Sequence, residues 1–454
     1  MALTVDWRLA PGIRLEPSGR GGLLLCGRHA ESLELAKEGG ALAAALLRLV
    51  EGTTAEALLA AGASTGDKAR LLHHLASLRR HGFLVAELRG GDGLLATLLP
   101  RSRDFEVDRA AARDEALQLS RFASLRREGE SLLLECTEAP CAALLHHPAL
   151  LASLHELVRP SRLPAQGDIA QVLLHLAEQG FLVAAAEEAS SAQRSWSFHD
   201  RLFHRRSRLH DDFQPHGGTY PFAGGGSETT FPSPPALRPA YAGEVLPLPL
   251  PAPARSRPLA EVMEARRSCR EMSEAPLALG QLAALLHRVA RIRALRERAG
   301  QDLLSRPYPS AGAIHELEFY LAVERCRDLA AGFYHYRGLE HALVRLESGT
   351  EPAGKMIGDC ARAWGREAQR PQALLVLSAR LPRLAWKYEA LAYRLALLDA
   401  GVVLQSLYLV ASDLGLNCAA AGSGRPQLFA QATGASSWEE TSIAEFGFGR
   451  ADAP

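Results

Sequence analysis

Lysine is the scarcest charged residue in this chain. Of 454 residues, 51 are basic, and only four of those are lysines: Lys37, Lys68, Lys355 and Lys387. Lysine differs from arginine because its ammonium changes protonation readily when it is buried. Each lysine is therefore either a site of ammonium chemistry or an ordinary surface residue, and the sequence alone leaves both interpretations open.

A net charge is also absent, because 51 acidic side chains balance the 51 basic ones. Proteins that bind nucleic acid or a membrane surface need a positive field, so the balance argues against both classes. The seven cysteines are an odd number and too few for a disulfide framework. Cys136 and Cys141 lie close together but lack a second pair at zinc-ligand spacing. We therefore expect no metal site, and cysteines that fill the core.

No segment has the pattern of a secretory signal, since residues 1–20 lack an apolar core of the required length. The longest apolar stretch, residues 395–416, contains Asp399, Gln405 and Asp413, which indicates a buried helix rather than a membrane span. These features favour a cytoplasmic protein. No strand is followed by G-x-G-x-x-G or G-x-x-x-x-G-K-[ST], so neither a Rossmann dinucleotide site nor a P-loop is supported.

The first 190 residues contain a degenerate repeat. Residues 81–86 (HGFLVA) and 179–184 (QGFLVA) superimpose, and each follows a strand and two or three helical segments. In each copy a glycine ends the last helix before a short apolar strand. This order predicts two winged-helix-like modules, residues 1–100 and 101–190, which serve either packing or peptide capture by strand addition. DNA binding is disfavoured because no basic stripe is present.

Residues 191–256 predict a packed connector that ends in an extended, proline-rich linker. Aromatic residues are frequent between Trp196 and Phe203, and a free linker does not usually carry them. His199 and His204 lie five residues apart, which is not helical metal-ligand spacing, so we expect them to form structural hydrogen bonds.

Residues 257–454 have a mixed α and β pattern. Apolar positions repeat with helical spacing in residues 282–292, and residues 317–323 and 373–377 are typical of strands. Residues 388–414 predict a long helix that ends at Gly415. This helix is apolar nearly all round, which predicts burial on most sides and, in a domain of this size, a homodimer interface.

Three segments of this region have residues suited to a ligand site. The first places three guanidiniums and a hydroxyl within five residues, a donor set for phosphate. The other two are turns of small residues, where the backbone can approach a flat ligand. Alone, the first is also typical of solvated surface and the others of ordinary loops. The segments are Arg266–Arg270 (RRSCR), Pro309–Gly312 (PSAG) and Gly422–Gly424 (GSG).

Together these segments resemble the nitroreductase-fold flavoenzymes. More narrowly, residues 309–315 (PSAGAIH) are similar to the SagB/McbC-type azoline dehydrogenases, which oxidise thiazolines and oxazolines to thiazoles and oxazoles. The resemblance continues through Lys387-Tyr388 and residues 393–408, and residues 198–220 resemble the longer members, including cyanobactin oxidases. It covers most of residues 20–454. Two features depart from the family: Glu316 stands where proline is usual, and Arg201 and Arg205 replace apolar or small residues.

The resemblance implies an α+β fold. Its C-terminal domain, residues 257–454, would bind FMN on an antiparallel-rich sheet flanked by helices and would form a dimer. Lys387 and Tyr388 correspond to the family's catalytic pair. The implied cofactor-binding residues are Arg266, Arg267, Ser268, Arg270, Pro309, Ser310, Ala311, Gly312, Gln405, Gly422, Ser423, Gly424 and Arg450.

The implied function is FMN-dependent oxidation of an azoline in a ribosomal peptide or a carrier-bound product, with oxygen reoxidising the flavin. A base removes the proton beside the carbonyl, while a hydride leaves the neighbouring methylene for the flavin. Either Lys387 or Tyr388 would be that base; otherwise they are a surface lysine and a core tyrosine. Implied partners are the azoline peptide, a second copy, and a cyclodehydratase or a peptide-synthetase carrier protein. The alternatives are an NAD(P)H-dependent nitroreductase-like enzyme and a flavin-less scaffold that presents peptide.

Overall fold

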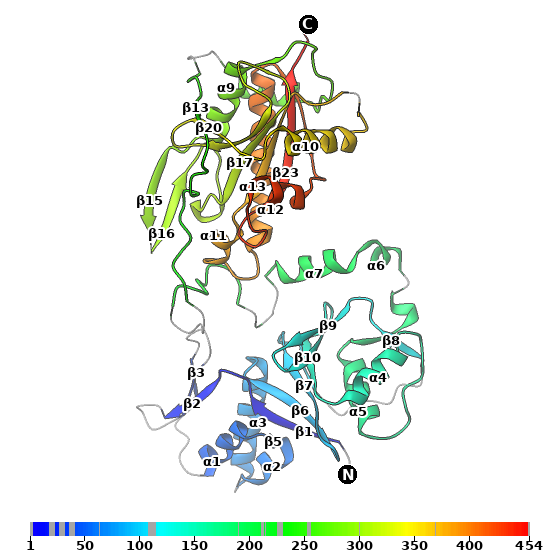
Figure 1. Ribbon diagram of the computed structural model, residues 1–454. Helices are drawn as coiled ribbons and strands as arrows, with labels where there is room; N and C mark the ends of the chain where they lie inside the picture. Colours follow the sequence, from blue (N-terminus) through cyan, green and yellow to red (C-terminus); the bar gives the residue numbers. More distant parts are fainter. Residues whose placement is uncertain are drawn as a thin grey trace. The chain divides into compact units, whose positions relative to one another are not determined.

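The chain forms two compact units, residues 1–215 and 216–454. The structure is a computed structural model that describes residues 3–17, 23–26, 32–35, 41–62, 64–107, 115–188, 190–209, 213, 215–224, 230–251, 256–298, 300–367 and 369–452. Figure 1 shows the helices and strands of both units.

The N-terminal unit is built on one seven-stranded antiparallel sheet with the order β5-β1-β6-β7-β11-β10-β9. Its strands are β5 Thr53–Thr54, β1 Thr4–Leu9, β6 Leu84–Gly90, β7 Gly93–Pro100, β11 Cys141–Leu145, β10 Ser131–Cys136 and β9 Ala123–Glu128. The helices of the unit are α1 Ala41–Leu47, α2 Ala55–Ala60, α3 Thr65–Arg80, α4 Pro148–Glu156, α5 Asp168–Glu178, α6 Ser191–Ser195 and α7 Phe198–Arg206. Small sheets are formed by β2 Arg14–Pro17, β3 Leu23–Cys26 and β4 Ser32–Leu35, and by β8 Leu117–Leu119 and β12 Leu182–Ala184.

This sheet unites the two segments that the sequence predicts as separate modules. Strand β7 of the first segment pairs with β11 of the second, with Pro100 opposite Cys141. One continuous hydrophobic core is formed by buried residues of both segments. The structure thus differs from two independent winged-helix-like modules, because the apolar edge of β7 is paired rather than exposed.

The repeated helix–glycine–strand signature itself is present twice. Helix α3 is followed by Gly82 at φ +70° and β6, and helix α5 by Gly180 at φ +82° and β12. The next amide closes each helix in the same way: Phe83 N–H donates to the Leu78 carbonyl and Phe181 N–H to the Leu176 carbonyl, both at 3.0 Å. Glycine fits because a left-handed residue ends a helix without a Cβ penalty.

The predicted connector, residues 191–256, is divided between the units. In its first part, Arg201 of α7 binds Glu138 at 2.7 and 2.9 Å within the N-terminal unit. In its second part, the Pro234 carbonyl accepts a hydrogen bond from Arg383 at 2.8 Å within the C-terminal unit. The unit boundary after Pro215 therefore falls inside this segment, where ion pairs and backbone hydrogen bonds replace periodic apolar packing.

The C-terminal unit contains a second seven-stranded sheet, with the order β13-β20-β19-β17-β21-β23-β22 (Figure 1). Its strands are β13 Val245–Pro247, β20 Ala342–Arg345, β19 Gly332–Arg337, β17 Leu317–Val323, β21 Ala373–Ala379, β23 Thr441–Arg450 and β22 Leu416–Ala421. The helices are α8 Leu259–Ala265, α9 Leu279–Ala290, α10 Thr350–Ala363, α11 Leu381–Ala385, α12 Ala392–Asp413 and α13 Pro426–Thr433. Short pairs are β14 Leu277–Ala278 with β18 Cys326–Arg327, and β15 Ala294–Arg298 with β16 Gln301–Ser305.

Helices cover both faces of this sheet, so its central strands are buried and largely apolar. In β17, Phe319 and Leu321 pack with α9 and α12, whereas Tyr320 and Ala322 pack with α10 and α13. All seven residues of β17 are buried. The predicted strand at 317–323 is confirmed, as is the helix through residues 282–290. A continuous apolar run, rather than an alternating one, is what two covered faces require.

The long helix α12 differs from its prediction in two ways. It begins at Ala392 rather than at 388, because Ala390 has φ +65° and Glu389 pairs with Gly217. It is also buried on one face only. Its opposite face exposes large apolar side chains, including Leu398 at 53% and Val402 at 36%. Among the described helices, α12 alone is long and apolar enough to cross a membrane. Core helices of water-soluble proteins can have the same length and composition.

Candidate functional site

Lys387 and Tyr388 lie in the short connection between α11 and α12. Their backbone amides both donate to the Leu384 carbonyl, at 3.0 and 2.7 Å, which closes the end of α11. The Lys387 carbonyl accepts a hydrogen bond from Tyr220 at 3.1 Å, and Thr219 donates to the Glu389 carboxylate at 2.6 Å. The connection is therefore held on one side by its helix and on the other by residues 217–220.

The two functional groups of this pair meet at Gly312. A Cβ placed on Gly312 would lie 2.6 Å from Lys387 Nζ and 2.6 Å from Tyr388 Oη. The ammonium otherwise faces aromatic rings, 5.8 Å from the Tyr220 centroid and 5.2 Å from that of Tyr388. Among the residues that the structure describes, no carboxylate pairs with Lys387. We call Gly312, Lys387 and Tyr388 the Lys–Tyr site.

The loop that carries Gly312 is strained and anchored by Asp399 of α12. Gly312, Ala313 and His315 have positive φ angles of +57°, +59° and +48°, which side chains other than glycine adopt at a cost of about 1–2 kcal/mol each. Asp399 accepts hydrogen bonds from Ser310 Oγ at 2.7 Å and from the Ala311 amide at 3.0 Å. Such strain persists only where its surroundings fix it, which is typical of functional sites.

The predicted arginine cluster follows α8 and runs beside the sheet edge at β22. The Cys269 amide donates to the Cys418 carbonyl at 2.9 Å, and Ser268 Oγ shares a 3.0 Å hydrogen bond with Tyr408 Oη. Arg266 lies over the Tyr408 ring, 5.5 Å from its centroid. We call residues 266–270 the arginine loop.

The arginine loop presents guanidiniums that the described residues leave free. Arg267 and Arg270 are exposed, and neither forms an ion pair within the described ranges. The next residues return to β23, where the Ser273 amide donates to the Arg450 carbonyl at 2.9 Å. Arg450 is likewise exposed at the end of that strand. This donor set of guanidiniums and a hydroxyl suits a phosphate group.

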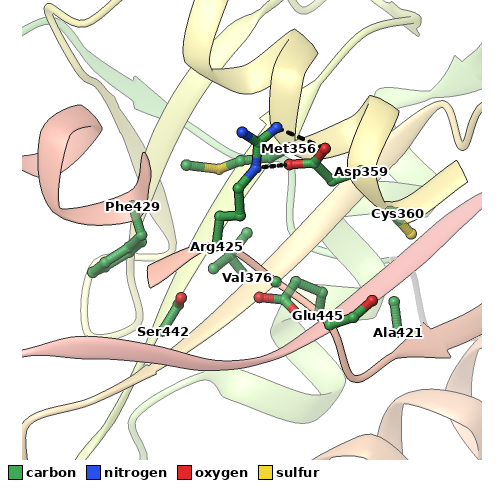
Figure 2. Close-up of a pocket in the computed structure, with 11 residues that line it drawn as sticks. Met356, Asp359, Cys360, Val376, Ala421, Arg425, Phe429, Ser442 and Glu445 are labelled. Atoms are coloured by element: carbon green, nitrogen blue, oxygen red, sulfur yellow. Dashed lines mark hydrogen bonds and ion pairs between the residues drawn. The ribbon is translucent and has the colours of Figure 1, made fainter. Parts of the chain in front are cut away.

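Part of the third predicted segment, Ser423 and Gly424, lines a cavity on the α10 and α13 side of the sheet. Figure 2 shows Arg425 and Asp359 paired at its rim, with a distance of 2.7 Å between Arg425 Nη2 and Asp359 Oδ1. Ser423 and Gly424 line this cavity with Glu445. Burial raises the pKa of Glu445 to about 7, although a backbone hydrogen bond from Gly424 opposes the rise. None of the residues of the Lys–Tyr site lines this cavity.

Within one chain the predicted site residues therefore form separate groups along α12. Asp399 anchors the Gly312 loop, and Tyr408 anchors the arginine loop nine residues later, which is about 14 Å along the helix and on its opposite flank. Gln405 lies on the exposed face between them, and Pro309 is exposed beside its loop. The Gly422–Gly424 segment joins the arginine loop through Tyr408, whose hydroxyl accepts the Ala420 amide at 2.8 Å.

Three residues of these groups were not predicted from the sequence as site residues: Asp399, Tyr408 and Glu445. Asp399 left a signal, because a carboxylate in an otherwise apolar helix needs partners when it is buried. Glu445 left the same signal in the apolar run of β23. Tyr408 left none that distinguishes it from a core residue. The strained turn at Tyr220, with φ +53°, belongs to a segment that the sequence does mark as packed.

His199, His204 and His315 lie in separate surroundings. The described residues contain no group of three His, Cys, Asp or Glu side chains able to hold an ion. The His199 side chain is largely exposed, and the His204 ring packs on Trp196 at 5.5 Å. His315 is buried against Tyr308, and burial together with Arg306 and Arg383 lowers its pKa to about 3.

Comparisons with known proteins place these features in a family. The nitroreductase family matches residues 263–450, and the cyanobactin oxidase ThcOx family matches residues 117–212. A Methanocaldococcus jannaschii protein named as a nitroreductase is 30% identical over 165 residues, which are 36% of this chain and 78% of that protein.

A narrower similarity is to an Escherichia coli protein. The microcin B17-processing protein McbC is 32% identical over 118 residues, 24% of this chain and 42% of McbC. The solved structure of the microcin synthetase McbBCD complex with truncated pro-MccB17 bound is 22% identical, with a TM-score of 0.33, and covers 40% of this chain and 68% of that chain. The protein thus belongs to the nitroreductase family of oxidoreductases, which typically bind flavin, and within it resembles the McbC and cyanobactin-oxidase type.

Proposed function

We propose that this protein is an FMN-dependent azoline dehydrogenase that converts thiazoline or oxazoline rings of a peptide into thiazoles or oxazoles. The observation that carries the proposal is the Lys–Tyr site, where an ammonium without a described counter-ion and a phenol converge on Gly312. The similarity to McbC, which processes microcin B17, supports a heterocycle in a ribosomal peptide as the substrate.

The chemistry of the Lys–Tyr site matches what azoline oxidation requires of the protein. One group must take the proton from the ring carbon beside the carbonyl, and the other must donate a hydrogen bond or share that proton. Lys387 Nζ and Tyr388 Oη are the two candidates, and both are partly shielded from water. Gly312 lets both groups approach the loop, since a Cβ at this position would lie 2.6 Å from each of them.

FMN fits the residues that the arginine loop offers. Arg266, Arg267, Ser268 and Arg270 would hold the phosphate, with Arg450 nearby, because guanidiniums bind phosphate oxygens in pairs. The open space in front of Gly422, where an added Cβ would meet nothing within 4 Å, leaves room for a flat ring. When bound, FMN supplies the hydride acceptor. Oxygen is the proposed acceptor for the reduced cofactor.

A second copy of the chain is the partner that we propose completes the site. The Lys–Tyr site and the arginine loop flank the exposed apolar face of α12, which includes Leu398 and Val402. The neighbouring helix α8 adds Leu259 and Met263, also exposed. Two such faces packed together would remove apolar surface from water. Leu398→Glu with Val402→Glu should give monomers that retain less flavin, measured by light scattering and absorbance, whereas Leu339→Glu, exposed at 51% elsewhere, should not.

Further partners follow from the same resemblance. The ThcOx match covers residues 117–212, so we propose that the N-terminal unit docks the peptide or the protein that delivers it. A cyclodehydratase or a peptide-synthetase carrier protein would supply the azoline.

The experiment that tests the function is turnover of a thiazoline-containing peptide by the full-length, flavin-loaded protein in air. Each oxidised ring loses two hydrogens, about 2 Da by mass spectrometry. A second candidate, an NAD(P)H-dependent nitroreductase, is favoured by the Methanocaldococcus jannaschii relative. Rapid flavin reduction by NADPH with no change in peptide mass would support that candidate and overturn the first.

A further inference from the structure

Two buried carboxyl groups lie beneath the Gly312 loop, and the proposed chemistry assigns them no role. Glu316 is fully buried at the start of β17, and Asp399 is buried on α12. Ser310 Oγ lies between them, 2.7 Å from Asp399 Oδ2 and 3.4 Å from Glu316 Oε2. The second carboxyl oxygen of Glu316, Oε1, has no hydrogen-bond partner among the described residues.

The surroundings favour one proton shared by this pair. Burial first, and the charge of Asp399 second, raise the pKa of Glu316 to about 8. Burial also raises the pKa of Asp399, while hydrogen bonds from Ser310, Ala311 and Glu316 oppose the rise. Two adjacent buried carboxylates repel each other, which favours a protonated Glu316 beside an ionised Asp399 at neutral pH.

Near the two carboxyls, Arg306 and Arg383 donate hydrogen bonds to backbone carbonyls and not to Glu316 or Asp399. Arg383, fully buried, directs its hydrogen bonds to the carbonyls of Pro234, Asp302 and Ile314. Arg306 donates to the Ala290 carbonyl. Among the other ionisable groups, Tyr308 interacts with both carboxyls and His315 belongs to the loop. Lys387 and Tyr388 face the loop at Gly312.

The pair fixes the strained loop. Asp399 accepts from Ser310 and Ala311, and Ser310 Oγ in turn accepts the His315 amide at 3.0 Å. These bonds span the positive-φ residues Gly312, Ala313 and His315. A second negative charge at Glu316 would repel Asp399 and disturb these hydrogen bonds. The loop would then no longer hold Gly312 in its place beside Lys387 and Tyr388.

We propose that Glu316 is a positioning residue: it holds a proton against Asp399, and the resulting singly charged pair fixes the loop that presents Gly312 to Lys387 and Tyr388. This inference rests on the proposed function of the Lys–Tyr site. It also gives a physical role to a residue that stands where related sequences usually have proline.

The first test compares Glu316→Ala with Glu316→Gln in turnover of a thiazoline peptide at pH 7. Glutamine donates the same hydrogen bond without a titrating proton, so it should keep turnover within about threefold of the unsubstituted protein. Alanine removes the donor and should lower turnover roughly tenfold to a hundredfold, the scale of a misplaced reacting group. Full turnover in the alanine variant would overturn the proposal.

The second test needs neither substrate nor flavin. Because the folded-state pKa of Glu316 lies above its unfolded value, its protonation stabilises the folded state at low pH, and that stability is lost as pH rises toward about 8. Urea unfolding of the flavin-free protein should show this decline, and Glu316→Gln should remove it.

Glu445→Gln is the matched control, since Glu445 is another buried carboxyl of the same sheet whose pKa is raised, to about 7. In the Glu445→Gln variant the free energy of unfolding should still fall as the pH approaches about 8. An unchanged profile in Glu316→Gln would overturn the inference even if azolines are oxidised. Absence of azoline oxidation in the unsubstituted protein would instead contradict the proposed function, and the unfolding profile would still decide whether Glu316 holds the proton.

Discussion

Two glycine loops of the C-terminal unit look alike in sequence and differ in structure. At Gly312 the missing side chain makes room for the chain's own Lys387 and Tyr388. At Gly424 it makes room for Glu445, whose Oε1 would lie 1.7 Å from an added Cβ, whereas Gly422 two residues earlier faces open space. A small residue in a loop can thus mark contact with a functional group, contact with a structural one, or space for a ligand.

The largest expected effect comes from Lys387. Lys387→Ala should lower turnover by about 100-fold or more, the scale of a lost proton-transfer group, while flavin absorbance at about 450 nm is kept. Lys355→Ala, which removes an exposed lysine paired with Glu351, is the control and should be without effect. Unchanged turnover in Lys387→Ala would mean that the contact at Gly312 is structural, like the one at Gly424.

Alanine substitutions at Gly424 and Gly422 test whether these two glycines have different roles. Gly424→Ala should destabilise the protein by about 2 kcal/mol, because a methyl group would overlap the buried Glu445 carboxyl. Gly422→Ala should change the free energy of unfolding by less than about 0.5 kcal/mol but weaken flavin retention if its open space holds the ring. Urea titration and flavin release measure the two effects. Equal destabilisation by both substitutions would contradict the distinction.

The smallest expected effect is at the arginine loop. Arg270→Ala should weaken flavin binding about tenfold, the scale of one lost charge-assisted hydrogen bond, without changing stability. Arg296→Ala removes an exposed arginine of β15 and serves as the control. Full flavin occupancy of the Arg270→Ala variant at limiting FMN would contradict the proposal that Arg270 binds the FMN phosphate.

The sequence predicts the strands and helices of the C-terminal unit better than it predicts which distant segments they contact. The apolar run at 317–323 and the strand at 373–377 are confirmed because burial on both faces leaves a local signature. The sequence predicts the start of α12 four residues too early, since the pairing of Glu389 with Gly217 depends on a segment 172 residues earlier.

The candidate site likewise depends on contacts between residues that are far apart in the sequence. The resemblance picked out Gly312 and Lys387, and the structure brings them together across 75 residues. No local pattern could indicate that Asp399 anchors Ser310, or that Gly424 is required by Glu445, because each pair joins separate elements. The sequence does not indicate that Glu316 is buried beside a second carboxyl, because that neighbour comes from α12 through the fold.

The proposed function can be tested in the anaerobic reaction of the flavin-loaded protein with a thiazoline peptide. We expect the peptide to bleach the absorbance at about 450 nm in a single turnover. The Lys387→Ala variant should be bleached at least about 100-fold more slowly, and NADPH should have little effect. Rapid bleaching by NADPH with no response to the peptide, or equal rates with and without Lys387, would contradict the proposal.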